Sequence, residues 1–187
     1  MGFLDTLKKV FNGGGAKIVT GSNKSFDIVF PNMPENLDSF KGLPQATLAA
    51  PYDTAALTVV ALSFYPKDRE LCYSALDFLR GPRPLSGVDK QFINDRFMDG
   101  KDYLMRSYFN GATPQNDYAP ASPYTVTVSE NPYSRENAGY LKLFIRSGGA
   151  DSARYVTLRN AKDGKWYLWE QFLLAVIRQP ESSNPWA

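Results

Sequence analysis

Charged and phenolic side chains gather in the short stretch of residues 98–108. It holds two carboxylates, two cations and two phenols, at Asp99, Lys101, Asp102, Tyr103, Arg106 and Tyr108. Such groups exchange protons in general acid–base catalysis and can also grip a polar ligand. The same residues suit a helix end at Asp99-Gly100 followed by a solvated turn, because charged side chains are common there for capping and dipole reasons. We favour the helix-end interpretation.

The composition limits the chemistry further. The 187 residues include no histidine and one cysteine, and 21 basic and 19 acidic side chains give a net charge of +2. Without histidine, Ser-His-Asp and Cys-His catalysis are excluded, as is the commonest transition-metal ligand. One cysteine cannot form an internal disulfide or a cysteine metal cluster. We therefore predict no metal site and no cofactor, and the intermixed charges predict no nucleic-acid partner.

A second candidate site is the string Ser-Gly-Gly-Ala-Asp-Ser at residues 147–152, directly after the hydrophobic run 140–146. This string resembles the pyrophosphate-binding loop of the ATP pyrophosphatase superfamily, and the resemblance implies ATP binding. Such a loop needs a following helix whose N-terminus faces the phosphates. Residues 153–159 alternate like a strand instead, and Gly-Gly-Ala-Asp is common turn chemistry. We therefore expect a β-turn, with Arg146, Asp151 and Ser152 forming a binding rim at one end of a sheet.

Tyrosines form a third candidate, along residues 110–133. Tyr118, Tyr124 and Tyr133 are interleaved there with amides and carboxylates. If these rings are exposed, they suit carbohydrate or peptide recognition. If they are buried, they pin a long loop to the core, and the sequence leaves both interpretations open.

Residues 166–169 read Trp-Tyr-Leu-Trp, so both faces of this predicted strand are apolar and we expect both to be covered. Glu170, at the end of the strand, is a candidate for projecting into a pocket. Cys72 lies among Leu and Ala residues, which predicts a small buried hydrophobe rather than a nucleophile.

Three helices are predicted in the middle of the chain, over residues 52–65, 68–80 and 86–98, each bounded by proline or glycine. A helix of at most two turns is predicted over 36–41, and short strands over 17–20 and 25–30. Period-2 alternation predicts strands over 124–129, 140–146, 154–159 and 165–170, with an Asp163-Gly164 hairpin turn before the last. Residues 110–123 are expected to form a long ordered loop. The run 172–177 suits either a helical turn or a strand.

Helices followed by strands predict an α+β fold, with about three helices packed on one face of a C-terminal antiparallel four-strand meander. We expect residues 16–187 to form a single domain. Residues 1–15 are predicted to be an appended amphipathic helix and a Gly-rich linker, with one apolar face made by Phe3, Leu4, Leu7, Val10 and Phe11. This face suits weak binding to a membrane surface or self-association. No stretch is long and apolar enough to span a membrane, and no secretory signal is present, so the expected location is the cytoplasm.

Several segments resemble a family of uncharacterised bacterial proteins, a domain of unknown function of gut-type Gram-positive bacteria. They are residues 33–41, 51–58, 96–103 and 111–118, and the resemblance covers most of residues 33–187. It implies no activity, cofactor or catalytic residue. Helices followed by a meander that ends in Asp-Gly-Lys-Trp-Tyr also resemble the cone-shaped fold of nuclear transport factor 2-like domains, which hosts both enzymes and binding proteins.

The sequence therefore predicts a binding or protein-interaction domain without an assembled catalytic site. The alternative is a small-molecule pocket protein or an enzyme that uses carboxylate and arginine chemistry. A more remote alternative is ATP binding at residues 147–152. The partner, whether a protein or a small molecule, cannot be identified from these residues.

Overall fold

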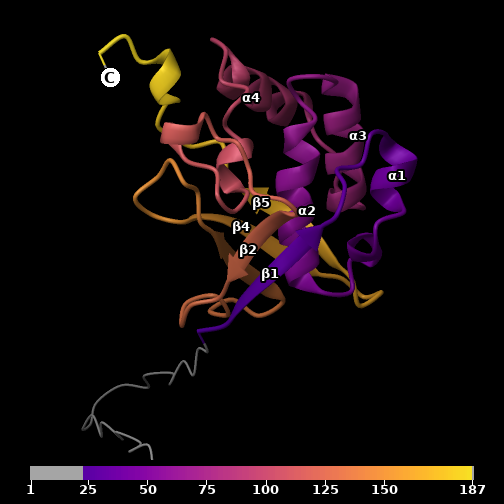
Figure 1. The fold of residues 1–187 in the computed structure, drawn as a ribbon. Helices are drawn as coiled ribbons and strands as arrows, with labels where there is room; N and C mark the ends of the chain where they lie inside the picture. Colours follow the sequence, from indigo (N-terminus) through magenta and orange to yellow (C-terminus); the bar gives the residue numbers. More distant parts are fainter. Residues whose placement is uncertain (1–22, 187) are drawn as a thin grey trace, which may run out of the picture.

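A computed structural model of the chain describes residues 23–186, which form an antiparallel sheet with helices packed against it (Figure 1). Over these residues the sheet has five strands in the order β1-β2-β3-β4-β5, each antiparallel to its neighbour. The strands are β1 Ser25–Phe30, β2 Tyr124–Ser129, β3 Tyr140–Ile145, β4 Arg154–Asn160 and β5 Trp166–Gln171.

Four α-helices lie between β1 and β2 in this described part: α1 Leu37–Lys41, α2 Pro51–Ser63, α3 Arg69–Arg80 and α4 Gly87–Phe97. Their starts follow from local sequence. Pro51 occupies the first turn of α2, where a missing N–H costs nothing. The Asp68 carboxylate accepts a hydrogen bond from the Leu71 N–H at 2.9 Å and caps α3. Four 3₁₀ turns complete the described elements: η1 Pro44–Thr47, η2 Arg106–Tyr108, η3 Pro114–Asn116 and η4 Glu181–Ser183.

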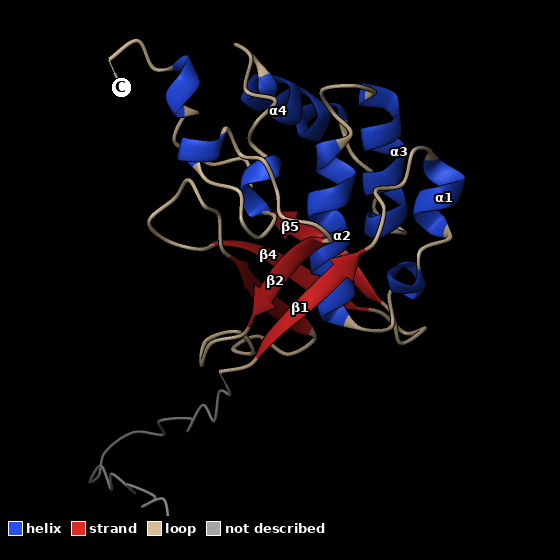
Figure 2. Cartoon of the chain, viewed as in Figure 1, coloured by secondary structure: helices blue, strands red, loops and turns tan. Residues whose placement is uncertain are grey.

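Helix α2 forms the centre of the core. All of its residues from 54 to 62 are buried, because the helix packs on the sheet with one side and on α3 with another. A helix buried all round needs apolar or small side chains all round, which this one has. The sheet supplies alternate side chains to the same core, as Leu141, Leu143 and Ile145 of β3 show. The helices lie on one side of the sheet, and we call the opposite side, which carries the alternate side chains, the outer face (Figure 2).

The predicted α+β class is confirmed, with corrections to the number of elements. Within residues 23–186 the sheet has five strands rather than four, because β1 pairs with β2 along its whole length, from Ser25 opposite Ser129 to Phe30 opposite Tyr124. The whole helical region separates these two strands, and local periodicity carries no information about pairing over such a distance. The short helix α1 forms where at most two helical turns were predicted, and it is the fourth helix beside the three predicted in the middle of the chain.

Residues 172–177 form neither of the predicted alternatives. They make a turn followed by an extended segment, in which Leu173, Leu174 and Ile177 are buried. The Leu173 carbonyl accepts a hydrogen bond from the buried Tyr108 hydroxyl at 2.5 Å. The apolar run therefore covers one end of the core without regular structure. The predicted helix over 3–11, the linker over 12–15 and the strand over 17–20 lie outside the described residues.

Candidate functional site

Residues 147–152 form a turn between β3 and β4, as the alternation after Ser152 predicted. The N–H groups of its two glycines are engaged within the protein. The Gly148 N–H donates to the Ser107 carbonyl at 2.8 Å, and the Gly149 N–H donates to the Ser147 hydroxyl at 3.1 Å. A phosphate-binding loop presents free N–H groups ahead of a helix, whereas this turn leads into strand β4. The geometry therefore lends no support to ATP binding here.

The two glycines of this turn serve close packing. A Cβ atom at Gly148 would lie 1.9 Å from the Ala112 carbonyl oxygen, and one at Gly149 would lie 2.0 Å from the Tyr118 hydroxyl. Asp151 forms an ion pair with Arg178 at the surface, and Arg146 is exposed. The predicted rim residues thus lie at one end of the sheet, but their binding role stays a prediction.

The charged stretch 98–108 forms the turn that follows α4. Asp99 and Gly100 both have positive φ, 63° and 71°, so the chain reverses here. Asp99, Asp102 and Arg106 are exposed and Lys101 is half-buried. The Arg106 guanidinium donates to the Asp117 carbonyl at 3.4 Å. These side chains lie at the surface rather than around a hollow, and ligand binding by them stays a prediction.

The three tyrosines of the long loop have different surroundings. Tyr118 is fully buried, stacks on Tyr103 at 5.6 Å between ring centroids, and donates to the Arg178 carbonyl at 2.6 Å. This ring pins the loop to the core. Tyr124 packs edge-on against Phe109. Tyr133 is 64% exposed and borders a groove on the outer face.

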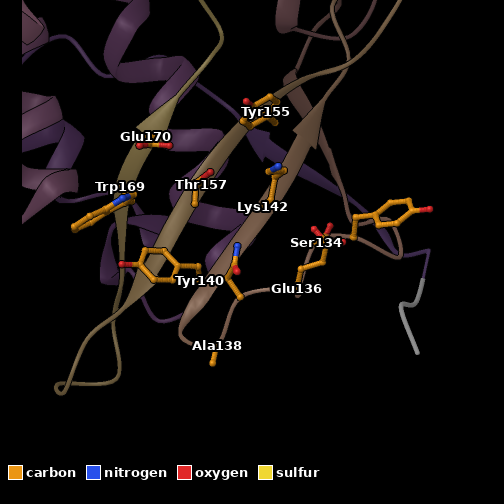
Figure 3. A pocket seen from close by; sticks show the side chains of 11 residues that line it. Ser134, Glu136, Ala138, Tyr140, Lys142, Tyr155, Thr157, Trp169 and Glu170 are labelled. Carbon is orange, nitrogen blue, oxygen red and sulfur yellow. The ribbon is translucent and has the colours of Figure 1, made fainter. Parts of the chain in front are cut away.

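We call this hollow the sheet-face groove (Figure 3). It has a volume of about 500 Å³, and its floor comes from the outer face of β3, β4 and β5 while residues 133–138 form one wall. Its lining side chains belong to Tyr133, Ser134, Glu136, Asn137, Ala138, Tyr140, Lys142, Tyr155, Thr157, Trp169 and Glu170. Of the residues considered as candidate sites from the sequence, Glu170 and Tyr133 line this groove.

A β-bulge in β5 shapes the groove. Leu168 pairs with Leu158 and Glu170 pairs with Thr157, so Trp169 is an extra residue with no partner opposite it. Such a residue lets two successive side chains reach the same face of a sheet. Trp169 and Glu170 both border the groove as a result (Figure 3). The predicted covering of both faces of β5 is therefore only partly right, since Leu168 is buried whereas Trp169 lies half-buried beside open space.

Aromatic rings and hydrogen-bonding groups alternate across the groove floor. Tyr140 meets Trp169 edge-on at 5.6 Å between centroids, and the Lys142 ammonium lies 4.8 Å from the centre of the Tyr155 ring. Within residues 23–186, neither Lys142 nor Glu170 forms an ion pair or a side-chain hydrogen bond. The groove thus offers aromatic rings beside the Lys142 ammonium and the carboxylates of Glu136 and Glu170.

A buried carboxylate holds the wall of residues 133–138 in place. Glu130 directly follows β2, and its side chain is 2% exposed. It accepts hydrogen bonds from the Arg135 guanidinium at 3.1 and 2.7 Å, and a further one from the Tyr52 hydroxyl of α2. The Lys142 N–H of β3 donates to the Ser134 carbonyl at 2.9 Å, which ties the wall to the groove floor.

These contacts shift the pKa values of Glu130 and Tyr52. Burial alone raises the pKa of Glu130, but the hydrogen bonds from Arg135 and Tyr52 and the Arg135 charge outweigh it and hold this pKa below its ordinary value of 4.5. Burial, aided by the hydrogen bond to Glu130, raises the pKa of Tyr52 to about 12. The pair is therefore an ionised carboxylate and a neutral phenol at neutral pH.

The sequence predicted few of the residues that line the groove, although their pattern in β3 and β4 indicates an exposed face. In β3 the outward residues Tyr140, Lys142 and Phe144 alternate with buried aliphatic residues, and in β4 Tyr155 and Thr157 do the same. Large aromatic and charged side chains on the solvent side of neighbouring strands indicate an exposed functional face. The loop that walls the groove has no comparable local signature.

Cys72 is buried, as predicted, and burial raises the pKa of its thiol. In the described range 23–186, no three His, Cys, Asp or Glu side chains lie close enough to hold a metal ion. Within the same range, the helices are too short or too polar to cross a membrane.

Fold and groove together define an α+β domain whose antiparallel sheet has one helix-covered face and one face with an aromatic groove. The chain belongs to the family described as Domain of unknown function (DUF6935), which matches residues 32–181. That span includes every described helix and strand except β1. No curated protein and no solved structure matches the chain. The resemblance to a family of uncharacterised proteins is confirmed, whereas the nuclear transport factor 2-like cone stays a prediction.

Proposed function

We propose that this protein is a non-catalytic binding domain whose sheet-face groove holds a saccharide. The observation that carries the proposal is the groove itself, in which the rings of Tyr140, Tyr155 and Trp169 lie beside polar groups and each has a cationic side chain within 5.3 Å of its centre. Ligand sites commonly combine apolar walls with a few polar groups that fix orientation. Aromatic rings that gather on a solvent-facing side of a sheet commonly mark an interaction site.

The polar groups favour a sugar over a strongly charged ligand. Lys142 is offset by Glu136 and Glu170 on the same lining, so the groove has no excess of positive charge. Asn137 and Thr157 are not charged and can donate or accept hydrogen bonds. A sugar ring has C–H faces that pack on aromatic rings and hydroxyl groups that bond to such side chains.

A glycan array followed by tryptophan-fluorescence titration tests the proposal. We expect saturable binding of at least one glycan, and at least about ten-fold weaker binding in Trp169→Ala and Tyr140→Ala, because truncating a central aromatic side chain costs about 2 kcal/mol or more. Trp186→Ala is the matched control, since Trp186 is 92% exposed and does not line the groove. Absence of glycan binding, or equal binding by all four proteins, would contradict the proposal.

The alternative function is catalysis in the same groove. Glu170 is a free carboxylate beside the hydroxyl and amine groups of the lining, which is the chemistry that the sequence allows. Conversion of a bound glycan by the wild type, lost in Glu170→Gln with binding retained, would favour an enzyme. Binding without turnover supports the binding domain.

We also propose, from the sequence alone, a cytoplasmic location in a bacterium and a tethering role for residues 1–15. The apolar face of Phe3, Leu4, Leu7, Val10 and Phe11 lies outside the described residues, and its proposed partner is a membrane surface or a second copy of the chain. Liposome co-sedimentation and light scattering, each with and without residues 1–15, test the tether. Identical behaviour of the two chains in both assays would rule it out.

A further inference from the structure

A second hollow, which we call the arginine cleft, shares Trp169 with the sheet-face groove. It has a volume of about 310 Å³ and lies between the turn after α3 and the β4–β5 hairpin. Its wall includes the cationic side chains of Arg80, Arg83, Arg159 and Lys162 and the rings of Tyr167 and Trp169. Among the described residues, this wall holds no carboxylate.

The turn after α3 brings two of these arginines to the sheet. Gly81 has a φ of +56°, and a Cβ atom there would lie 2.4 Å from the Tyr167 ring, so the backbone passes directly against β5. Arg80 is 7% exposed and is held in place, since its Nε donates to the Arg83 carbonyl at 2.9 Å and its Nη2 lies 3.6 Å from the Asp89 carboxylate. Arg80 therefore forms a fixed part of the cleft wall, and the Asp89 carboxylate offsets its charge.

Arg83 and Arg159 are not neutralised in this way. Their guanidinium carbons lie 4.0 and 4.9 Å from the centre of the Trp169 ring, and both residues are exposed. Neither side chain forms an ion pair or a hydrogen bond within residues 23–186. Two cations on one ring lie within about one Debye length, ~10 Å at 0.1 M salt, so they repel each other unless an anion joins them.

The carboxylates near the cleft offset only part of its positive charge. Asp89 contacts Arg80. Asp163, at the hairpin, accepts hydrogen bonds from the Tyr167 hydroxyl at 2.7 Å and the Lys165 N–H at 3.0 Å. Glu170 does not line this cleft, but it lines a neighbouring hollow together with Arg80 and Arg83, and it forms no ion pair with either. The cleft therefore keeps an excess of positive charge although the whole chain carries only +2.

We propose that the arginine cleft binds a small polyanion that carries phosphate or carboxylate groups. The guanidinium groups of Arg83 and Arg159 and the ammonium group of Lys162 contact the anion, because a planar guanidinium donates paired hydrogen bonds to such oxygens. Trp169 holds the two guanidinium groups in position through its ring face. This site shares Trp169 with the saccharide groove, but the proposal does not depend on that function.

Isothermal titration of the full chain with sodium pyrophosphate, citrate and acetate, at matched ionic strength, tests the site. We expect saturable binding of pyrophosphate, citrate or both, and none of the singly charged acetate. Affinity should fall at least ten-fold in Arg83→Gln and in Arg159→Gln, and binding should vanish in the double variant. Pyrophosphate alone would indicate a phosphate site, and equal binding of citrate would indicate a general polyanion site.

Two control variants separate this site from other effects. Arg96→Gln removes an exposed arginine that also lies over a ring, Phe92 at 4.9 Å, and should leave binding unchanged. Tyr155→Ala alters the sheet-face groove but not the cleft lining, so this variant should bind the polyanions with wild-type affinity. The proposal is overturned if no polyanion saturates the wild type, if the double variant binds as well as wild type, or if Arg96→Gln loses as much affinity.

Discussion

The guanidinium group of Arg135 grips the carboxylate of Glu130 with two hydrogen bonds, from Nε at 3.1 Å and from Nη2 at 2.7 Å. Glu130 directly follows β2, and Arg135 lies in the segment that forms one wall of the sheet-face groove. One side chain is buried and the other is 53% exposed. The pair therefore connects the core to the groove wall, and the wall's position depends on it.

Removing the carboxylate should destabilise the fold. In Glu130→Ala, the Tyr52 hydroxyl and the Arg135 guanidinium lose their shared acceptor, and we expect the free energy of unfolding to fall by about 1.5–3 kcal/mol. Urea denaturation measures this. Glu136→Ala, an exposed change in the same wall, should stay within about 0.5 kcal/mol of wild type. Equal stability of the two variants would show that the buried pair is not a structural anchor.

The same pair predicts a pH dependence. Because the pKa of folded Glu130 lies below its ordinary value of 4.5, the carboxylate stabilises the fold above that pH. This contribution is lost as the pH falls through the folded-state pKa. The gap in unfolding free energy between wild type and Glu130→Gln should therefore be widest near about pH 7 and narrow below about pH 4.5. A gap that widens on acidification would contradict the assignment.

Glycines 148 and 149 should tolerate no side chain. In Gly148→Ala the new Cβ meets the Ala112 carbonyl, a backbone atom that cannot rotate away, so we expect a loss of about 1–3 kcal/mol or more. Thermal unfolding measures the loss. Gly87→Ala is the matched control, because a Cβ atom there meets nothing within 4 Å. If the two variants melt alike, the close approach at Gly148 is not real.

Tyr118→Phe isolates one hydrogen bond. The ring and its stacking on Tyr103 remain, whereas the bond to the Arg178 carbonyl is lost, so the expected cost is about 1 kcal/mol. Hydrogen exchange should rise in the segment around Arg178. Tyr133→Phe, in which the hydroxyl belongs to an exposed ring, should change neither stability nor exchange. Unaltered hydrogen exchange around Arg178 in Tyr118→Phe would count against this hydrogen bond.

Local features of the fold could be predicted because they depend on neighbouring residues. Proline at the start of α2 and the Asp163-Gly164 hairpin turn both act within a few residues. Period-2 alternation likewise located β2 to β5. The β1–β2 pairing and the irregular course of residues 172–177 could not be predicted, since contacts with distant parts of the chain determine both.

In the candidate sites, too, the sequence indicated individual residues, whereas contacts with distant segments determined how they are arranged. Glu170 was singled out at the end of its strand, but the bulge that turns it to the same face as Trp169 comes from pairing with β4. Tyr118 and Tyr133 have similar sequence surroundings, yet one is buried and the other exposed. Burial depends on which segments pack above a residue, and no local pattern records that.

The sequence by itself determined the α+β class, the helix boundaries, the turn at residues 147–152 and the exclusion of histidine chemistry. Each of these follows from residue type or short-range spacing. Only the tertiary structure decided that residues 133–138 wall a groove on the sheet, and that Arg83 and Arg159 meet at Trp169. The physical reason is that strand register, a bulge and a buried ion pair bring distant residues together, and these depend on the folded chain as a whole.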